Sequence, residues 1–374
     1  MRTDESVAFV EPSLVRRGQC KATYRRGDET MVDREDIASQ RRQAIMPLKK
    51  VLASLKSTES ALLIGIREKS LLVLILVLVF FLFSILLPYF FQARNFIIIL
   101  RQNNVKILLA SALTIIIISG GMDLSIGSIL AFCSVLSAIV MKQKVPGAVI
   151  YAVLAGLAAG ALLGMFNGLL TVKLKIDPWL VTLATLTLIR GFAYAISRGQ
   201  VIGDIPNNFL DLLTAHTGPF PNMLWICLLV ILVLQWLLTS TTWGLRTRAI
   251  GANRLASIYC GISVNRNVVV LYGLSGFVAA IGGFMVIGEG GSTTPYIANG
   301  IELDSIAGAV IGGTSFNGGI GSISGTVLGV LLIGVIQDGL AMTGLSTSYL
   351  RLSRGLILLV VVFLAAIRQS ARQS

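Results

Sequence analysis

Four polar side chains stand inside long apolar stretches of the sequence: Asp123, Asn167, Glu302 and Asp304. A charged group at the centre of a membrane helix costs about 2.5–3.5 kcal/mol, so such groups usually line a polar path, pair with one another or relay ions. The chemistry that these residues could carry is therefore the passage of a polar solute, of protons or of sodium.

Asp123 lies in the segment SGGMDLSIGS, in which Gly120 and Gly121 interrupt an apolar run and Ser125 adds a hydroxyl group. A broken helix that lines a wet cavity would explain this composition. Alternatively, Asp123 caps the following helix, because a carboxylate accepts backbone N–H groups at a helix N-terminus. The two interpretations are compatible, and the sequence leaves both open.

Motifs for enzymatic chemistry are missing from the sequence. The single histidine, His216, has no Ser or Cys nucleophile pattern near it. The dipeptide Gly-Lys does not occur, so the chain lacks a GxxxxGK[ST] phosphate-binding loop. The cysteines have neither paired nor CxxC spacing: Cys20, Cys133, Cys227 and Cys260. We expect no catalytic site, no metal site, no disulfide framework and no cofactor in this chain.

The largest charged island of the second half is the run Thr242–Arg266, TWGLRTRAIGANRLASIYCGISVNR. It carries four arginines and no acidic residue, so the positive-inside rule places it in the cytoplasm. Its helix formers predict a short helix from Arg246 to Cys260, with Gly261 as a left-handed C-cap. Small residues at three- and four-residue spacing give one face that a partner could approach closely: Ala249, Ala252, Asn253, Ala256 and Cys260. The alternative is an ordinary solvated loop.

Composition indicates an integral membrane protein. Of the 374 residues, 55% are hydrophobic and 13% charged, and the mean hydropathy is +0.81, whereas soluble domains carry about 25% charged residues. The net charge of +13 is scattered between apolar runs, which indicates orientation in a bilayer and argues against nucleic acid as a partner. The expected fold class is all-α, with about ten transmembrane helices in a membrane domain over residues 61–370.

Residues 1–60 hold about half of the acidic residues and show little apolar periodicity. They predict a polar, disordered cytoplasmic extension. No secretory signal peptide is expected, since no short apolar core follows the first basic residues. Translation could instead begin at Met31 or Met46, and detection of peptides from residues 2–30 would exclude that alternative.

A membrane crossing needs about 20 apolar residues. About ten segments meet this length or come close to it: 71–91, 102–119, 124–141, 147–172, 178–198, 222–240, 267–288, 302–316, 321–342 and 352–368. Pro146, Pro178 and Pro221 stand where helix starts are expected. With both termini inside, the run 242–266 is cytoplasmic, and orientation rests mainly on this run and on the basic stretch Lys49–Lys69.

Glycine patterns indicate close packing and a weak internal repeat. Asn167, in GALLGMFNGLL, is typical of helix packing through small residues. The glycine-rich segment from Glu302 to Gly325 predicts two packed helices joined by a short turn near residues 317–321. GMDLS (121–125) resembles GIELD (300–304), and Gly160 and Gly164 have counterparts in Gly325 and Gly329. Two five-helix halves would make an inverted repeat, which is common in transporters.

Three segments together carry a resemblance: SGGMDLSIGS (119–128), AIGANRLASIYCGISVNR (249–266) and GIELDSIAGAVIGGTSFNGGIGSISGTVLG (300–329). In order and spacing they resemble the permease subunits of bacterial ribose-type sugar ABC importers, over about residues 70–368. The resemblance implies a bacterial inner-membrane protein, a second permease copy in a homo- or heterodimer, a cytoplasmic ATPase that binds ATP and Mg, and a periplasmic or lipid-anchored solute-binding protein.

By the same resemblance, the run 242–266 is the segment that couples to the ATPase, through Gly251, Ala252, Asn253, Ala256, Gly261 and Ile262. The chain departs from the family pattern at Ala252, where a second glycine is usual, and at Arg254 and Leu255, where an acidic pair is usual. These departures put in doubt which ATPase it pairs with. Residues expected on the solute path are Asp123, Ser125, Asn167, Glu302, Asp304, Thr314, Ser315 and Asn317.

Two alternatives remain at the level of sequence. In a secondary transporter, Asp123, Glu302 and Asp304 would relay protons or sodium without a partner enzyme. A related permease would use the same machinery for branched amino acids or a furanone signal. The sequence does not name the solute, because the binding protein largely sets it.

Overall fold

The structure is a computed structural model that describes residues 69–143 and 145–373. The predicted extension over residues 1–60, the alternative starts at Met31 and Met46, and the basic stretch Lys49–Lys69 up to residue 68 lie outside the described residues. The basic tail from Arg368 is described as helix only up to residue 373.

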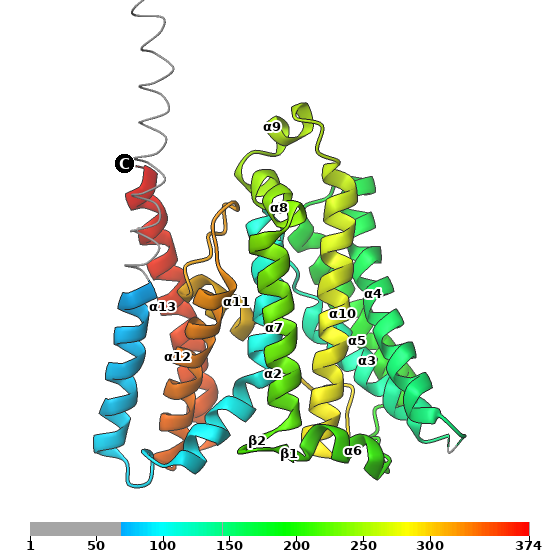
Figure 1. The fold of residues 1–374 in the computed structure, drawn as a ribbon, viewed down its shortest axis with the longest axis vertical. Helices are drawn as coiled ribbons and strands as arrows, with labels where there is room; N and C mark the ends of the chain where they lie inside the picture. Colours follow the sequence, from blue (N-terminus) through cyan, green and yellow to red (C-terminus); the bar gives the residue numbers. More distant parts are fainter. Residues whose placement is uncertain (1–68, 144, 374) are drawn as a thin grey trace, which may run out of the picture. The chain divides into compact units, whose positions relative to one another are not determined.

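Each of the ten predicted segments coincides with one helix (Figure 1). Within the described residues, seven helices are long and apolar enough to cross a membrane. They are Lys69–Leu86, α2 (Ala93–Ile118), α4 (Ala148–Leu174), α5 (Pro178–Ser197), α7 (Asn222–Ser240), α10 (Val264–Gly290) and α12 (Ile323–Met342). The other three are α3 (Ile126–Met141), the eleven-residue α11 (Ile301–Ile311) and α13 (Thr347–Gln373). The predicted all-α membrane fold is confirmed.

Short elements close the two ends of the helix bundle (Figure 1). At one end lie α6 (Asn207–Thr214) and the two-residue strands β1 (His216–Thr217) and β2 (Phe220–Pro221), paired antiparallel. At the other end lie α8 (Thr242–Ala252) and α9 (Arg254–Tyr259). Proline starts α5 at Pro178, and α7 begins directly after Pro221, as the fixed φ of proline favours.

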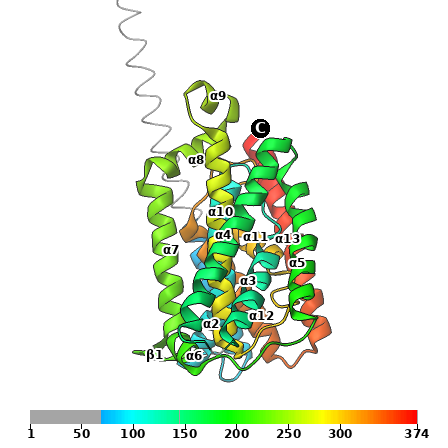
Figure 2. The ribbon, with the colours of Figure 1, turned by 90° about the vertical axis from the view of Figure 1, so that its right-hand side faces the viewer.

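Helices α4 and α10 pack side by side through glycine (Figure 2). A Cβ atom at Gly160 would collide with the carbonyl oxygen of Gly276, and one at Gly276 with that of Gly160. One helical turn away, a Cβ atom at Gly164 would collide with the carbonyl oxygen of Tyr272. The two backbones are therefore in direct contact, the close packing through small residues that the glycine pattern predicted.

The two halves of the bundle are interleaved. Helix α2 packs on α11 and α12, whereas α10 packs on α3 and α4. α2 and α10 also contact each other and run in opposite directions: α2 ends beside α8, and the residue Thr293 that follows α10 pairs with Ile202 just before α6. The repeated motifs occupy equivalent places in α2–α5 and α10–α13. The opposite directions of α2 and α10 are those that an inverted repeat requires, and the two five-helix halves stay a prediction.

The hairpin of α11 and α12 differs from the expected short turn. Its connection spans residues 312–322 and reaches to α8. Gly308 and Gly312 of the first arm and Gly325 and Gly329 of the second pack so closely that a Cβ atom on any of the four would collide with the facing arm. The tight packing was predicted, but the turn was predicted too short, because the connection makes contacts of its own.

Candidate functional site

The structure has two helices, α8 and α9, where a single helix from Arg246 to Cys260 was predicted. The break lies at Asn253, whose backbone is extended (φ −158°, ψ 103°). The Asn253 side-chain oxygen accepts the N–H of Ala256 at 2.9 Å and thereby caps α9. Asparagine competes with helical hydrogen bonding in this way, which the helix propensity of its neighbours does not show. Gly261 adopts φ +77°, the predicted left-handed conformation.

Most of the predicted coupling residues are exposed at this end of the molecule. Ala252, Asn253, Ala256 and Gly261 are exposed, and Ile262 is half-buried. Three large apolar side chains of α9 protrude beside them: Leu255, Ile258 and Tyr259, the last 89% exposed. We call these three the α9 knob. An exposed apolar group flanked by arginine is typical of a protein-binding surface.

Gly251 has a different position, inside the contact between α8 and the bundle. A Cβ atom there would collide with the carbonyl oxygen of Ile118, at the end of α2. It would also lie 2.6 Å from the backbone nitrogen of Gly319, whose N–H donates to the same Ile118 oxygen at 2.7 Å. Gly318 and Gly120 pack against Gly251 as well. We call Gly120, Gly251, Gly318 and Gly319 the glycine junction.

The glycine junction joins α8 to both halves of the bundle. Gly120 belongs to the connection between α2 and α3, and Gly318 and Gly319 belong to the connection between α11 and α12. These three adopt left-handed φ of +75° to +81°, which favours glycine. Arg248 of α8 adds a second link, donating to the Gly321 carbonyl at 3.1 Å. Partial burial lowers the pKa of the Arg248 guanidinium. A displacement of α8 must therefore move both connections.

A buried polar cluster follows directly after the glycine junction. The Asp123 carboxylate accepts three hydrogen bonds: from the backbone N–H of Ser125 at 2.9 Å, from its hydroxyl at 2.6 Å and from the Ser275 hydroxyl at 3.0 Å. Asn167 donates to the Ser125 hydroxyl at 2.7 Å, and Tyr272 donates to the Met122 carbonyl at 2.7 Å. The predicted residues Asp123, Ser125 and Asn167 are thus brought together, and the cluster joins α3, α4 and α10.

The break in the helical run is present, but Asp123 is not the N-cap of α3, which is Ser125 without a side-chain capping bond. Residues 119–125 are non-helical, so the helical run is broken there, and Asp123 accepts an N–H at the start of α3. The carboxylate is fully buried (0% exposed), so it does not line an open aqueous surface in this conformation. Ser275 and Tyr272 were not predicted as members of this cluster. The sequence indicates them only as polar groups within an apolar segment.

Asp123→Ala is expected to lower the free energy of unfolding by about 1–3 kcal/mol, because Ser125 and Ser275 would lose a buried acceptor. Thermal unfolding of the purified protein measures this change. Asp211→Ala is the matched control, since Asp211 lies exposed on α6. An equal shift in both variants would contradict the structural role given to the Asp123 cluster.

Glu302 and Asp304 point to different partners although both lie in the first turn of α11. Asp304 lies 3.9 Å from the ammonium of Lys106 on α2 and 3.4 Å from the guanidinium of Arg354 on α13. Lys106 also donates to the Gln337 side chain on α12 at 2.7 Å. Asp304 is buried, so this cluster joins four helices through paired charges. The sequence pattern does not point to Lys106, Gln337 or Arg354 as partners of Asp304.

Glu302 instead packs against α3. A Cβ atom at Gly127 would collide with its carboxylate, and one carboxylate oxygen has no hydrogen-bond partner within the described part of the chain. Arg190 of α5 lies nearby and donates to the carbonyls of Pro295 at 3.0 Å and Ile297 at 2.7 Å. Arg190 thus holds the connection that leads into α11.

The remaining predicted path residues lie apart from both clusters. Thr314, Ser315 and Asn317 belong to the connection between α11 and α12, which carries part of the glycine junction. Thr314 is 3% exposed, whereas Asn317 is exposed. The structure therefore divides the predicted path residues into four groups rather than one site: the Asp123 cluster, Asp304 with its cations, Glu302 against α3, and the connection between α11 and α12.

Comparison with known proteins places the chain among transport proteins. The family model described as "Branched-chain amino acid transport system / permease component" matches residues 95–364. The ribose import permease protein RbsC of Bacillus subtilis is 37% identical over 286 residues, covering 75% of this chain and 87% of that protein. RbsC of Haemophilus influenzae is 33% identical over 301 residues, covering 79% and 92%. The L-arabinose transport system permease protein AraH of Escherichia coli is 34% identical over 256 residues, covering 68% and 77%. No solved structure matches significantly.

Proposed function

This chain belongs to the family of permease components that is named after branched-chain amino acid transport systems. We propose that it is the transmembrane permease subunit of an ABC importer and that it moves a monosaccharide into the cell. The observation that carries this proposal is the similarity, over most of its length, to permeases named for ribose and for arabinose. A five-carbon sugar is the solute class that these names favour.

A second candidate solute is a branched-chain amino acid, because the family description names that class. The three relatives described above are named for sugars, which favours the first candidate. An ion-coupled secondary transporter is not favoured by this family membership. In this proposal ATP hydrolysis is carried out by a separate ATPase subunit, which binds ATP and Mg.

The partner at the α8 and α9 end is a cytoplasmic ATPase in this proposal. The α9 knob offers Leu255, Ile258 and Tyr259 to an apolar groove, and the exposed Arg246 and Arg254 favour acidic residues at the rim of that groove. Gly251 then acts within the permease, by passing the motion of α8 to the connections before α3 and α12. The other exposed predicted residues contact the ATPase.

The opposite end, with α6, β1 and β2, would receive the periplasmic or lipid-anchored solute-binding protein. In this arrangement both termini are cytoplasmic, the membrane is the bacterial inner membrane, and a second permease copy completes the transporter. Loaded receptor and ATP-driven closure of the ATPase open the bundle outward, and hydrolysis reverses the change. Switching between 1:99 and 99:1 requires about 5.5 kcal/mol, which nucleotide binding at the ATPase can supply.

Uptake of radiolabelled ribose or arabinose into proteoliposomes tests the proposal. The vesicles contain the permease with the ATPase and the solute-binding protein of the same transporter, and ATP is added on the ATPase side. Uptake is expected only when all components and ATP are present. Uptake driven by an ion gradient without the ATPase would instead support a secondary transporter.

Ala256→Arg is expected to leave membrane insertion intact and to reduce ATP-dependent uptake about tenfold or more, because a loss of 1.4 kcal/mol at an interface is a factor of ten. Ala256 is exposed on α9 beside the capping residue Asn253, so a long side chain there obstructs a docked partner without disturbing the bundle. Ala256→Ser, which keeps the side chain small, is the control. Normal uptake by Ala256→Arg would refute the role of this face.

A further inference from the structure

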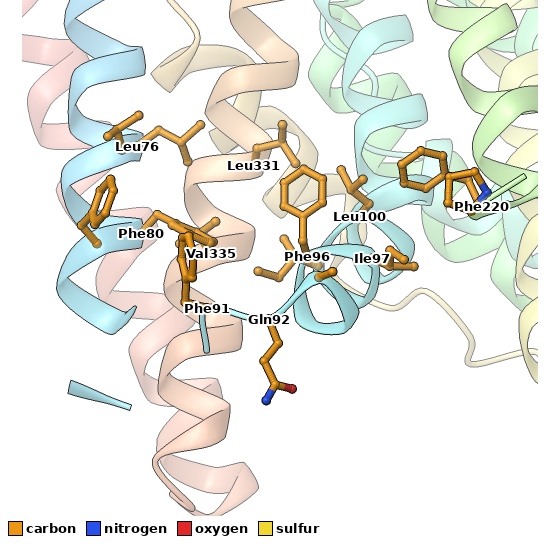
Figure 3. Close-up of a pocket in the computed structure, with 15 residues that line it drawn as sticks. Leu76, Phe80, Phe91, Gln92, Phe96, Ile97, Leu100, Phe220, Leu331 and Val335 are labelled. Atoms are coloured by element: carbon orange, nitrogen blue, oxygen red, sulfur yellow. The ribbon is translucent and has the colours of Figure 1, made fainter. Parts of the chain in front are cut away.

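An apolar pocket of about 600 Å³ lies between the helix Lys69–Leu86, the start of α2 and the middle of α12 (Figure 3). Its lining includes Phe80, Phe91 and Phe96 together with the aliphatic residues Leu76, Leu331 and Val335. Among the described residues that line it, Gln92 alone has a polar side chain, and Figure 3 shows it pointing away from the aromatic side chains.

A second apolar pocket, of about 310 Å³, continues the first one toward α7. The two share Leu100, Phe220 and Leu331 as lining residues. The second pocket extends along α2 and α7 as far as Ile107 and Ile231. Together they form a groove from the helix Lys69–Leu86 past β2 to α7, which we call the outer groove.

The lining of the outer groove disfavours a sugar and water, because Gln92 and Asn104 are the amide side chains among its otherwise mostly apolar described lining residues. A hydroxyl group buried there would lose its hydrogen bonds to water and find almost no replacement, at a cost of several kcal/mol. Apolar cavities of this kind take up apolar ligands instead. The groove is lined by helices that are long and apolar enough to span a bilayer, so the apolar molecules that surround it are the acyl chains of lipids.

The rim of the outer groove has the composition of a membrane interface. Tyr89, which is 72% exposed, and Gln92 lie in and beside the connection that leads into α2. Arg94 follows the lining residue Ala93 and is exposed. Tyrosine and arginine at this level meet lipid headgroups in membrane proteins, and arginine pairs with phosphate. The acidic residue of this region, Asp338, is buried (6% exposed) and does not stand on the rim.

We propose that the outer groove is a binding site for a membrane phospholipid, with an acyl chain against Phe80, Phe96 and Leu331 and the phosphate at Arg94. The lipid would fill the space between the helix Lys69–Leu86 and the bundle. Only 6% of the apolar stretch of that helix is buried within the protein. A bound acyl chain would therefore cover part of the apolar surface that the helix turns toward the bundle. This inference does not depend on which solute the permease carries.

Photo-crosslinking of the unaltered protein tests the site. The chain is reconstituted in nanodiscs with a phospholipid that carries a diazirine in one acyl chain, and peptides are mapped by mass spectrometry. Labels are expected to concentrate in residues 76–100 and 327–335, at several times the level found on the exposed α7 residues Leu229 and Leu232. Equal labelling of both surfaces would overturn the proposal, as would a crosslink from the groove to a second copy of the chain.

Two variants test occupancy by native mass spectrometry after detergent extraction. Leu331→Trp narrows the groove where the two pockets meet and is expected to reduce retained phospholipid severalfold, whereas Leu229→Trp, outside the groove, is expected to retain it. Arg94→Ala is expected to weaken retention of phospholipid but not of a detergent with an uncharged headgroup. Unchanged retention in both Leu331→Trp and Arg94→Ala would overturn the site, whatever the result of the sugar-uptake experiment.

Discussion

Replacing Gly251 by valine is expected to lower coupled solute uptake strongly while the basal ATP hydrolysis of the partner persists. The new side chain would collide with the Ile118 carbonyl and crowd the N–H of Gly319, so α8 could no longer seat against both connections. Coupling energies between sites are typically about 1–3 kcal/mol, and losing such a term lowers coupled uptake about 5- to 150-fold. Uptake and ATPase rates are measured on the same proteoliposomes.

The matched control is Gly290→Val. Gly290 is the last residue of α10, has nothing within 4 Å of an added Cβ atom, and is exposed. This variant is expected to transport at the normal rate. Thermal unfolding of both proteins separates lost coupling from lost folding. Full uptake by Gly251→Val would contradict the role of the glycine junction, and Gly251→Ala should fall between the valine variant and the unaltered protein.

Replacing Asp304 by leucine is expected to destabilise the protein by about 3 kcal/mol. Removing one partner of a buried ion pair typically costs about 3–5 kcal/mol, because the remaining charge is left uncompensated. The lower end applies here, since the Arg354 side chain is 45% exposed and solvent screens it, whereas the Lys106 side chain is only 16% exposed. Unfolding of the purified protein in denaturant measures the loss.

A double variant tests whether the unpaired charge of Lys106 causes the loss of stability in Asp304→Leu. Lys106→Met together with Asp304→Leu is expected to be more stable than Asp304→Leu alone, because no unpaired ammonium remains. Asp204→Asn provides the control, because Asp204 adopts φ +58°, a left-handed conformation that asparagine tolerates. The ion pair of Asp204 with Lys142 has a similar length, 3.4 Å, but the Asp204 side chain is 81% exposed, so a change below about 1 kcal/mol is expected. Additive effects of the two core substitutions would argue against a direct charge pairing.

The positions of the long helices could be predicted from sequence because each is specified locally. A run of about 20 apolar residues is sufficient to define a membrane crossing. Proline then marks the starts of α5 and α7, and the glycines of α4 pointed correctly to close packing. The break at Asn253 was missed, because the capping hydrogen bond of a single side chain outweighed the helix propensity of its neighbours.

The grouping of the candidate site residues could not be predicted in the same way. Sequence indicates that Asp123, Glu302 and Asp304 need partners, but the partner depends on how each helix is rotated in the bundle. Two positions only two residues apart show this: Glu302 meets α3, whereas Asp304 meets Lys106 and Arg354. Gly251 was expected to contact another protein, and only the folded chain reveals that the Ile118 backbone already occupies its free side.

The exchange of partners between α2 and α10 bears on how the chain is made. Helices α11 and α12, on which α2 packs, are synthesised roughly two hundred residues after it begins. The early helices α2 and α4 therefore enter the bilayer before the helices on which they pack have been made. Their packing surfaces stay uncovered until contacts between residues far apart in the sequence can form. In a nascent chain that stalls before α11, Lys106 would lack the carboxylate of Asp304 that pairs with it in the folded protein.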